Sequence, residues 1–320
     1  MDKPRWRRLW HSPDVGVGCD RPGMQTIDWP FRAVEALEAG ALTFRELRRF
    51  HTAVYPGVWV PREAELSPVQ RARAAWLWSG RAGVPAGLSA SAMLGSKWID
   101  QRDPAELIHT NRRPPRLLTV HSDTLSDGET QVIDGMVVTT PARTAFDLGR
   151  RLPFVDGVQR IDALMNATHV KVEEVLALAE GYRGARGVRR LRLILEYVDG
   201  GAESPYESST RIMLVTNGFP EPETQIEVAD ASGTVFARLD MGWPEYRVAV
   251  EFDGAQHWTD SEQRSWDIDR QAMLEALGWT VIRVSAGLLH GRRQVVVDRV
   301  RAALLARGCR MGLGRAERAF

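Results

Sequence analysis

Residues 29–62 switch from helical to strand-like spacing of their apolar positions. "FRAVEALEAG" predicts a short amphipathic helix, and "TFRELRRF" predicts a second one, with Thr43 and Glu46 at the spacing of a capping box. "TAVYPGVWVP" then predicts two short strands around a Pro-Gly turn. Two helices followed by a hairpin are typical of a small winged helix-turn-helix, and a helical hairpin that only packs on the next segment gives the same pattern.

Residues 63–200 carry a mixed pattern of helices and strands. Helices are predicted at "SPVQRARAAWLWSGR" and "TPARTAFDLGRRL", and strands at "AELIHT", "RLLTVHS" and "MVVTT". Arg143 and Asp147, four positions apart, have the spacing of an ion pair on a helix surface. The small residues of "VDGGAES" interrupt the pattern, so a domain boundary is predicted over residues 198–204.

A regular series of elements follows this boundary. A helix at "SPYESSTRIMLVTNGF" precedes strands at "TQIEVAD", "TVFARLDMGW" and "RVAVEFDG", and then come a helix at "SEQRSWDIDRQAMLEALG", a strand at "WTVIRVS" and a helix at "RQVVVDRVRAALLARG". The predicted order is α-β-β-β-α-β-α, which makes the chain as a whole an α/β (α+β) protein. Residues 1–28 and 310–320 are predicted to be tails, the first one partly ordered.

Composition places the chain among ordinary globular proteins. It has 320 residues, enough for two domains with a core each, and 44% of them are hydrophobic. The two isolated cysteines, Cys19 and Cys309, give neither a disulfide framework nor a zinc finger, which favours a cytoplasmic location. No apolar run reaches membrane-spanning length. The last lysine is Lys171, and residues 201–320 hold 14 arginines against 17 carboxylates.

Carboxylates gather on two neighbouring predicted strands. In "RVAVEFDG", Glu251 and Asp253 alternate with apolar positions, so they share the less apolar face of the strand. The short turn "WPEY" predicts antiparallel pairing with the preceding strand, which brings Asp240 near Glu251. Glu207 projects from the first turn of the preceding helix. Like charges on paired strands need a partner, and a Mg²⁺ ion bound by Asp240, Glu251, Glu207 and the backbone carbonyl of Phe252 would supply one.

A simpler interpretation exists for each carboxylate alone. Asp240 can end a strand, Asp253 can belong to an Asp-Gly turn, and Glu251 can pair with an arginine such as Arg238 or Arg247. The occurrence of all these carboxylates in this element order favours the metal site.

The motifs "SPYES", "ARLDMGWPEYRVAVEFDGAQHW" and "DIDRQAMLEALGWTVIRVS" resemble a nuclease-like domain related to the very-short-patch repair (Vsr) endonucleases, in the PD-(D/E)XK, or restriction-endonuclease-like, superfamily. The resemblance covers about residues 201–307 and implies, for a domain over residues 201–309, an α-β-β-β-α-β order with a central mixed sheet. It implies that Asp240 and Glu251 are the two metal-binding acids and Glu207 the helix carboxylate of a site using Mg²⁺ or Mn²⁺.

One position departs from the superfamily pattern. The lysine that should stand two residues after the second acid is Asp253 here. The Vsr-like branch also lacks that lysine and uses a nearby histidine, a role that His257 would take as a catalytic proton-transfer group. Arg270 and Gln271 are candidates for contacting phosphate. Asp267, three positions before Arg270, is a further accessory candidate or a simple helix-surface partner.

The segments "GALTFRELRRF", "YPGVWVP", "SASAMLG" and "VVTTPARTAFDL" resemble AbiEi-type antitoxins of type IV toxin–antitoxin systems, over residues 63–200 and the winged-helix-like segment. This resemblance implies DNA as a partner, with a toxin partner or a homodimer left open. Candidate phosphate contacts are arginines of two predicted helices, namely Arg45, Arg48, Arg49, Arg186, Arg189 and Arg190. For the last three, a solvated helix start is the simpler interpretation.

Two functions follow from these features. The first is a cytoplasmic, Mg²⁺-dependent DNA endonuclease that hydrolyses phosphodiesters, with an N-terminal DNA-binding or regulatory region. The second is a non-catalytic, antitoxin-like transcriptional regulator whose nuclease domain is degenerate. The missing lysine favours the second, and the retained Glu207, Asp240, Glu251 and His257 favour the first.

Overall fold

The computed structural model of the protein describes residues 27–111, 113–253 and 261–310. The chain divides into two compact units, residues 1–65 and 66–320, and the predicted boundary over residues 198–204 lies inside the second unit. The predicted tails lie almost entirely outside the described residues. None of the described helices is both long enough and apolar enough to cross a membrane.

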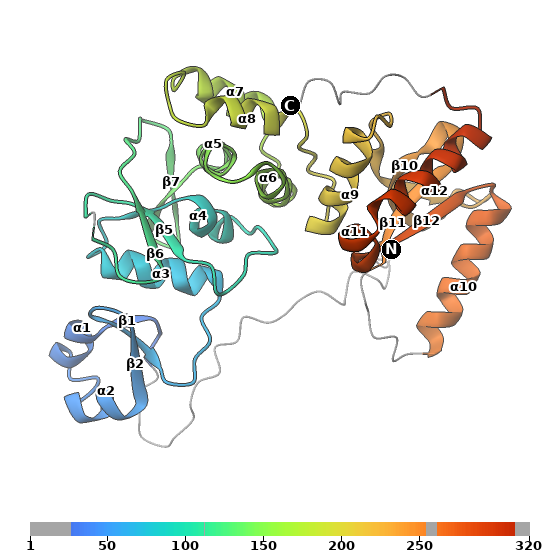
Figure 1. Ribbon diagram of the computed structural model, residues 1–320. Coiled ribbons are helices and arrows are strands. Elements are labelled where there is room, and N and C mark those ends of the chain that lie inside the picture. Colours follow the sequence, from blue (N-terminus) through green and yellow to red (C-terminus); the bar gives the residue numbers. More distant parts are fainter. Residues whose placement is uncertain (1–26, 112, 254–260, 311–320) are drawn as a thin grey trace. The chain divides into compact units, whose positions relative to one another are not determined.

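The first unit contains the two helices and the hairpin that its sequence predicts (Figure 1). Its elements are β1 (Phe31–Arg32), α1 (Ala33–Glu38), α2 (Phe44–Phe50), β2 (His51–Tyr55) and β3 (Val58–Pro61). The strands form an antiparallel sheet in the order β1-β3-β2. Helix α2 begins with the predicted capping box, in which the Thr43 N–H donates to Glu46 over 2.8 Å and the Glu46 N–H donates to the Thr43 hydroxyl.

The second unit begins with a mixed region that is richer in helix than its sequence predicts. Its elements are α3 (Pro68–Trp78), β4 (Val84–Pro85), α4 (Gly87–Met93), β5 (Ala105–Ile108), β6 (Leu118–His121), β7 (Thr130–Ile133), β8 (Met136–Thr139), α5 (Pro141–Arg151), α6 (Phe154–Thr168), α7 (Val172–Glu180) and α8 (Val188–Leu195). The sequence pattern predicts no helix over α4, α6 or α7. The strands form a β4-β5-β6 sheet and a β7-β8 hairpin. The apolar faces of α5, α6, α7 and α8 enclose one core, which contains Phe146, Ile161 and Leu191.

The prediction that Arg143 and Asp147 pair on the surface of α5 is wrong in one respect, because the pair is buried. Arg143 and Asp147 are both fully buried, and the Arg143 Nε donates to the Asp147 carboxylate over 3.0 Å. Arg143 also contacts Glu129, and Arg150 reaches the other oxygen of Asp147 over 2.9 Å. A buried charge needs such partners, so this network fills the space between α5 and the strands instead of facing water.

The remainder of the second unit has the predicted element order with one short helix added. It comprises α9 (Pro205–Thr216), β9 (Glu223–Ala229), β10 (Val235–Trp243), the 3₁₀ turn η2 (Pro244–Tyr246), β11 (Val248–Asp253), α10 (Ser261–Ala276), β12 (Thr280–Ser285), α11 (Ala286–Gly291) and α12 (Arg293–Ala306). The sheet order is β12-β11-β10-β9. Strands β11 and β12 are parallel and the other pairs are antiparallel, which confirms the predicted mixed sheet.

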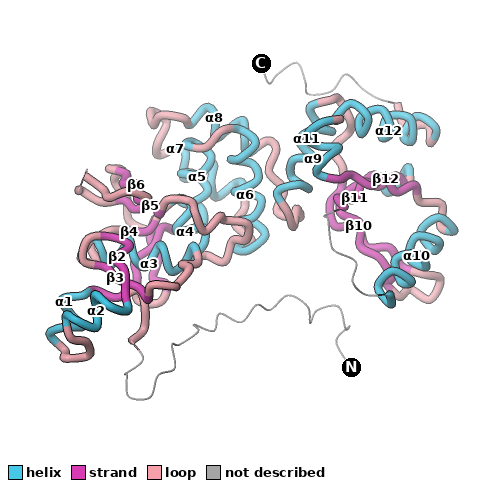
Figure 2. The backbone as a smooth tube through the Cα atoms, turned by 60° about the horizontal axis from the view of Figure 1, so that its bottom comes forward, coloured by secondary structure: helices cyan, strands magenta, loops and turns pink. Residues whose placement is uncertain are grey.

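Helices cover both faces of this sheet (Figure 2). Val248 and Val250 of β11 pack with residues of α9, α11 and α12, whereas Ala249 packs with Leu274 of α10 on the opposite face. Because side chains alternate along a strand, Glu251 shares the α10 side of the sheet with Ala249. The face of the sheet that carries Glu251 is therefore covered by α10, and the Glu251 carboxylate lies beneath this helix.

Candidate functional site

Antiparallel pairing of β10 with β11 brings Asp240 and Glu251 together. The pairing ends at Met241 and Val250, so Asp240 and Glu251 are the next residues along the two strands. Beyond that point the Asp240 carboxylate takes over from the backbone, because its Oδ2 accepts the Phe252 N–H over 2.7 Å. The predicted neighbourhood of the two acids is thus present, at the point where the two strands part.

Asp240 lies in an environment that opposes its charge. Burial raises the pKa of Asp240 to about 7, and the nearby carboxylates of Glu207 and Glu251 act in the same direction. The hydrogen bond from Phe252 and the positive charge of Arg270 oppose this rise. A carboxyl group that titrates near neutral pH among other acids is the electrostatic signature of a site that accepts a proton or a cation.

Glu207 reaches the same site from the first turn of α9. Ser204 caps this helix by accepting the Glu207 N–H over 3.2 Å, and Pro205 occupies the first helical position. The Glu207 side chain is 8% exposed, and its Oε2 accepts the Glu203 N–H over 2.9 Å. Gln225 of β9 donates to the same oxygen over 3.3 Å. Burial raises the pKa of Glu207, although these hydrogen bonds favour its charged form.

Glu251 has a cationic partner from α10. The guanidinium of Arg270 donates to both carboxylate oxygens of Glu251, and both side chains are largely buried. The arginines proposed as simple partners of Glu251 lie elsewhere, since Arg238 pairs with Glu203 and Arg247 donates to the Leu277 carbonyl. A positive charge therefore stands beside the second acid, supplied by a helix instead of the strand position that Asp253 occupies.

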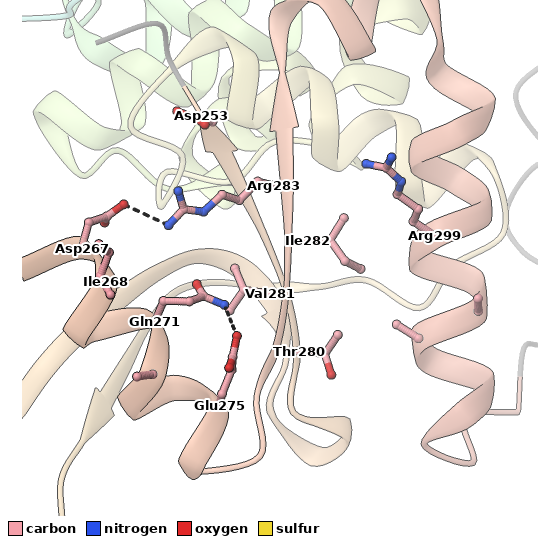
Figure 3. Close-up of a pocket in the computed structure, with 13 residues that line it drawn as sticks. Asp253, Asp267, Ile268, Gln271, Glu275, Thr280, Val281, Ile282, Arg283 and Arg299 are labelled. Carbon is pink, nitrogen blue, oxygen red and sulfur yellow. Dashed lines mark hydrogen bonds and ion pairs between the residues drawn. The ribbon is translucent and has the colours of Figure 1, made fainter. Parts of the chain in front are cut away.

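The accessory candidates surround a groove beside the carboxylates. Asp253, Asp267 and Gln271 line a groove of about 1060 Å³ between α10, the edge strand β12 and α12 (Figure 3). Asp267 bonds to Arg283 of β12 over 3.0 Å and lies 3.8 Å from Arg270, so the predicted helix pair is present. The Gln271 amide donates to Glu275 over 2.9 Å, along its own helix. Asp253 is exposed at the end of β11.

This groove is distinct from the acidic site, because Glu207, Asp240 and Glu251 do not line it. We therefore take the carboxylate geometry, and not the groove, as the candidate centre. His257, the predicted proton-transfer group, lies outside the described residues.

The acidic site suits a hard cation by its donor chemistry. Within residues 27–111, 113–253 and 261–310, no group of three or more His, Cys, Asp or Glu residues has the geometry of a formed metal site. The carboxylates of Glu207 and Glu251 nevertheless both raise the pKa of Asp240, and burial raises the pKa of Glu207 as well. Oxygen donors of this kind match the preference of Mg²⁺, which leaves part of its coordination to water and substrate.

An aromatic contact next to the site escaped the sequence analysis. The Tyr206 ring stacks on the Phe252 ring, with centroids 4.3 Å apart and planes 3° from parallel. Tyr206 directly precedes Glu207, and Phe252 directly follows Glu251. The stack thus joins α9 to β11 beside Glu207 and Glu251. Its signal in the sequence is the aromatic residue next to each of these two acids.

Comparison with known families accounts for both parts of the second unit. Residues 209–304 match the family REase_MTES_1575, a restriction-endonuclease-like domain, and residues 66–197 match the AbiEi antitoxin C-terminal domain. The chain thus joins a region that matches the AbiEi antitoxin C-terminal domain, called the antitoxin domain from here on, to a restriction-endonuclease-like domain. The predicted resemblance to such a fusion is therefore confirmed. Asp240 and Glu251 lie within the restriction-endonuclease-like match, and Glu207 lies two residues before it.

Two mycobacterial proteins are similar to this chain. The uncharacterized protein MT2308 of Mycobacterium tuberculosis strain CDC 1551 / Oshkosh and the uncharacterized protein Rv2248 of strain ATCC 25618 / H37Rv are each 31% identical to it over 180 residues. The match covers 54% of this chain and 66% of each relative, just under two thirds of their length. No solved structure matches the chain.

The antitoxin domain presents the predicted arginines near the start of α8. Arg186 and Arg190 line a cavity of about 570 Å³ together with Arg150 and Arg151 of α5. Arg189 lines an adjoining cavity of the same volume. All three predicted arginines are exposed, so the structure leaves them accessible to a phosphate backbone.

The predicted arginines of the first unit lie on α2. Arg45, Arg48 and Arg49 are exposed, and Arg62 of the adjoining segment donates to the carbonyl oxygens of Arg48 and Arg49 over 2.9 and 3.1 Å. These bonds fix the end of α2 to the residue that follows the hairpin. Whether the helix contacts DNA remains a prediction.

Proposed function

We propose that the protein is a DNA endonuclease of the Vsr-like type, which hydrolyses phosphodiester bonds with the aid of Mg²⁺ or Mn²⁺. The observation that carries the proposal is the position of Asp240, a buried carboxyl group between Glu207 and Glu251 in a restriction-endonuclease-like domain. Acids that gather at one place repel one another and weaken the fold there, so their clustering favours a function that uses their negative charge.

Glu207, Asp240, Glu251 and the carbonyl group of Phe252 would hold the ion. When bound, it activates water and neutralises charge on the scissile phosphate. The raised pKa of Asp240 means that this site must lose a proton before it can take a cation, so its affinity rises toward neutral pH. The hydrogen bond from the Phe252 N–H would orient the Asp240 carboxylate for this role.

Arg270 would occupy the role of the missing strand lysine. Its guanidinium already lies at Glu251, so a phosphate entering the site can draw it away from the carboxylate by offering a second bidentate partner. His257, four positions after Asp253, would accept the proton from the attacking water as a general base.

The rest of the chain would deliver the DNA. The arginines of the winged-helix-like segment and of the region around α8 would attract the phosphate backbone, whatever the DNA sequence. The antitoxin domain is a candidate for regulation by a toxin partner or by a second copy of the chain. Neutralisation of phosphates by these arginines makes the affinity for DNA fall as salt rises.

The test is cleavage of supercoiled plasmid by the purified full chain. Conversion to nicked or linear DNA with Mg²⁺ or Mn²⁺, and none with EDTA, supports the proposal. DNA binding without cleavage under any divalent ion would identify instead a regulator with a degenerate nuclease domain.

A further inference from the structure

Helix α9, which carries Glu207, is held between the two domains of the second unit. Ile212 and Val215 on one side of α9 join the core formed by α5 to α8, whereas Met213 and Leu214 join the core of the nuclease sheet. Figure 1 shows α6 of the antitoxin domain next to α9. The helix therefore belongs equally to both cores, and its position depends on both.

Asp162 of α6 makes the central polar contact between these helices. Its Oδ2 accepts the Ser208 hydroxyl over 2.7 Å and the Arg211 guanidinium over 2.8 Å, and its Oδ1 accepts the Asp199 N–H over 2.7 Å. Both Asp162 and Arg211 are 1% exposed. Every bond of this carboxylate is thus directed at α9 or at the segment that leads into it.

Gln159, one turn earlier on α6, holds the beginning of the same helix. Its side-chain amide donates to the Pro205 carbonyl over 3.0 Å and to the Ser209 hydroxyl over 2.7 Å. Residues on both sides of Glu207 are therefore anchored to α6, while the Glu207 side chain itself turns toward Gln225 and the nuclease sheet. Because a helical turn is stiff, α6 fixes the rotation of α9 and the direction in which Glu207 points.

We propose that Asp162 is a positioning residue of the nuclease site, and that the antitoxin domain acts through it to hold Glu207 beside Asp240. This inference rests on the proposed nuclease function. A buried ion pair contributes little net stability compared with apolar residues of the same size, but its directional bonds specify one arrangement. The domain that resembles an antitoxin is then a structural part of the nuclease site, and a partner that shifts α6 alters cleavage without touching the acids.

The proposal is tested on the full chain with Asp162→Asn, which keeps the side-chain shape and removes the charge. Ser208→Ala is the milder second variant, since it removes the hydroxyl that donates to Asp162 and leaves the Asp162–Arg211 ion pair intact. The matched control is Asp147→Asn, because Asp147 is an equally buried, arginine-paired carboxylate of the antitoxin domain that makes no hydrogen bond or ion pair with α9.

Two quantities are measured alongside thermal unfolding. Hydrogen exchange of the peptide covering residues 204–212 reports the anchoring of α9, and steady-state cleavage of plasmid reports kcat and KM. Asp162→Asn and Ser208→Ala are expected to speed exchange of this peptide and to lower kcat about tenfold or more with KM unchanged, the scale of a small misplacement of a reacting group. Asp147→Asn is expected to lower the melting temperature and to leave both readouts near wild type.

Each alternative outcome overturns a defined claim. Wild-type exchange and kcat in a folded Asp162→Asn or Ser208→Ala protein overturn the positioning role, and so does an equal loss of kcat in Asp147→Asn. Absence of cleavage by the wild-type protein overturns the proposed function and this inference with it, and is recognised because it needs no variant.

Discussion

The guanidinium of Arg270 lies against the carboxylate of Glu251, so a helix residue neutralises the second acid of the candidate site. Glu251 stands on β11 and Arg270 on α10, nineteen positions later in the chain. The strand position that would carry a lysine holds the exposed Asp253 instead. A cation is thus present at the site, but it occupies a carboxylate that a metal ion would also use.

Arg270→Ala should separate metal binding from catalysis. Without the competing Arg270 guanidinium, Glu251 is free for the ion, so Mn²⁺ affinity measured by calorimetry should increase about fivefold, which corresponds to roughly 1 kcal/mol. Cleavage should fall about 100-fold, because the phosphate loses a positive partner. Arg283→Ala is the control, since Arg283 lies beside Glu251 on β12 but pairs with Asp267. Weaker metal binding in Arg270→Ala would show that the arginine supports the site instead of competing for it.

The raised pKa of Asp240 makes stability depend on pH. The folded chain keeps the Asp240 proton up to about pH 7, whereas the unfolded chain loses it near pH 4. Between these values the folded state binds the extra proton, so the contribution of Asp240 to the free energy of unfolding falls as pH rises. Asp240→Asn removes this loss. The melting temperature of Asp240→Asn, relative to that of wild type, should therefore be higher at about pH 8 than at about pH 5.

Differential scanning calorimetry of the two proteins at these pH values measures the effect. Asp298→Asn, which replaces an exposed carboxylate of α12, should show the same difference from wild type at both. A constant difference for Asp240→Asn as well would mean that Asp240 has an ordinary pKa.

His257 and Asp253 should contribute unequally to catalysis. His257→Ala is expected to lower the cleavage rate about 100-fold, the usual scale for loss of a general acid or base. Asp253→Asn should have a much smaller effect, because Asp253 is exposed at the strand end and makes no contact with the acids that the described residues record. The rate constants of single-turnover plasmid cleavage compare the two variants. Survival of cleavage without His257 and its loss in Asp253→Asn would reverse the two roles.

The exposed arginines of α2 should determine part of the salt dependence of DNA binding. Arg48→Ala is expected to weaken binding equally for all sequences and to reduce the slope of log affinity against log salt by about one. Arg32→Ala in the same unit is the matched control, since Arg32 pairs with Glu35 over 3.0 Å. Fluorescence anisotropy with a labelled duplex at several salt concentrations measures the slope. An unchanged slope for Arg48→Ala would remove α2 from the DNA interface.

Local signals in the sequence were sufficient for the elements and for the pairing of the acids. The Thr43 capping box and the short turn between β10 and β11 act over a few residues, so the spacing alone specifies them. The alternation along β11 correctly predicts that Glu251 and Val250 point to opposite faces of the sheet. The position of Glu207 in the first turn of its helix brings its side chain close to Asp240.

Contacts between distant elements could not be derived in this way. Arg143 and Asp147 have the spacing of a surface pair, and only the packing of α5 shows that they are buried. The sequence places arginines such as Arg238 and Arg247 near Glu251 along the chain, whereas in the fold its partner is Arg270 of α10. The role of Asp162 has no local sequence signal, because its ion-pair partner Arg211 lies 49 positions away in the chain, on α9.

Cleavage of supercoiled plasmid by wild type and by Asp240→Asn, side by side with Mn²⁺, tests the central claim most directly. Asp240→Asn keeps the side-chain shape and removes the carboxylate at the centre of the acidic site, and Asp298→Asn serves as the control. The account predicts cleavage by wild type and by Asp298→Asn, no detectable cleavage by Asp240→Asn, and the same circular dichroism for all three. Cleavage by Asp240→Asn at the wild-type rate would contradict it.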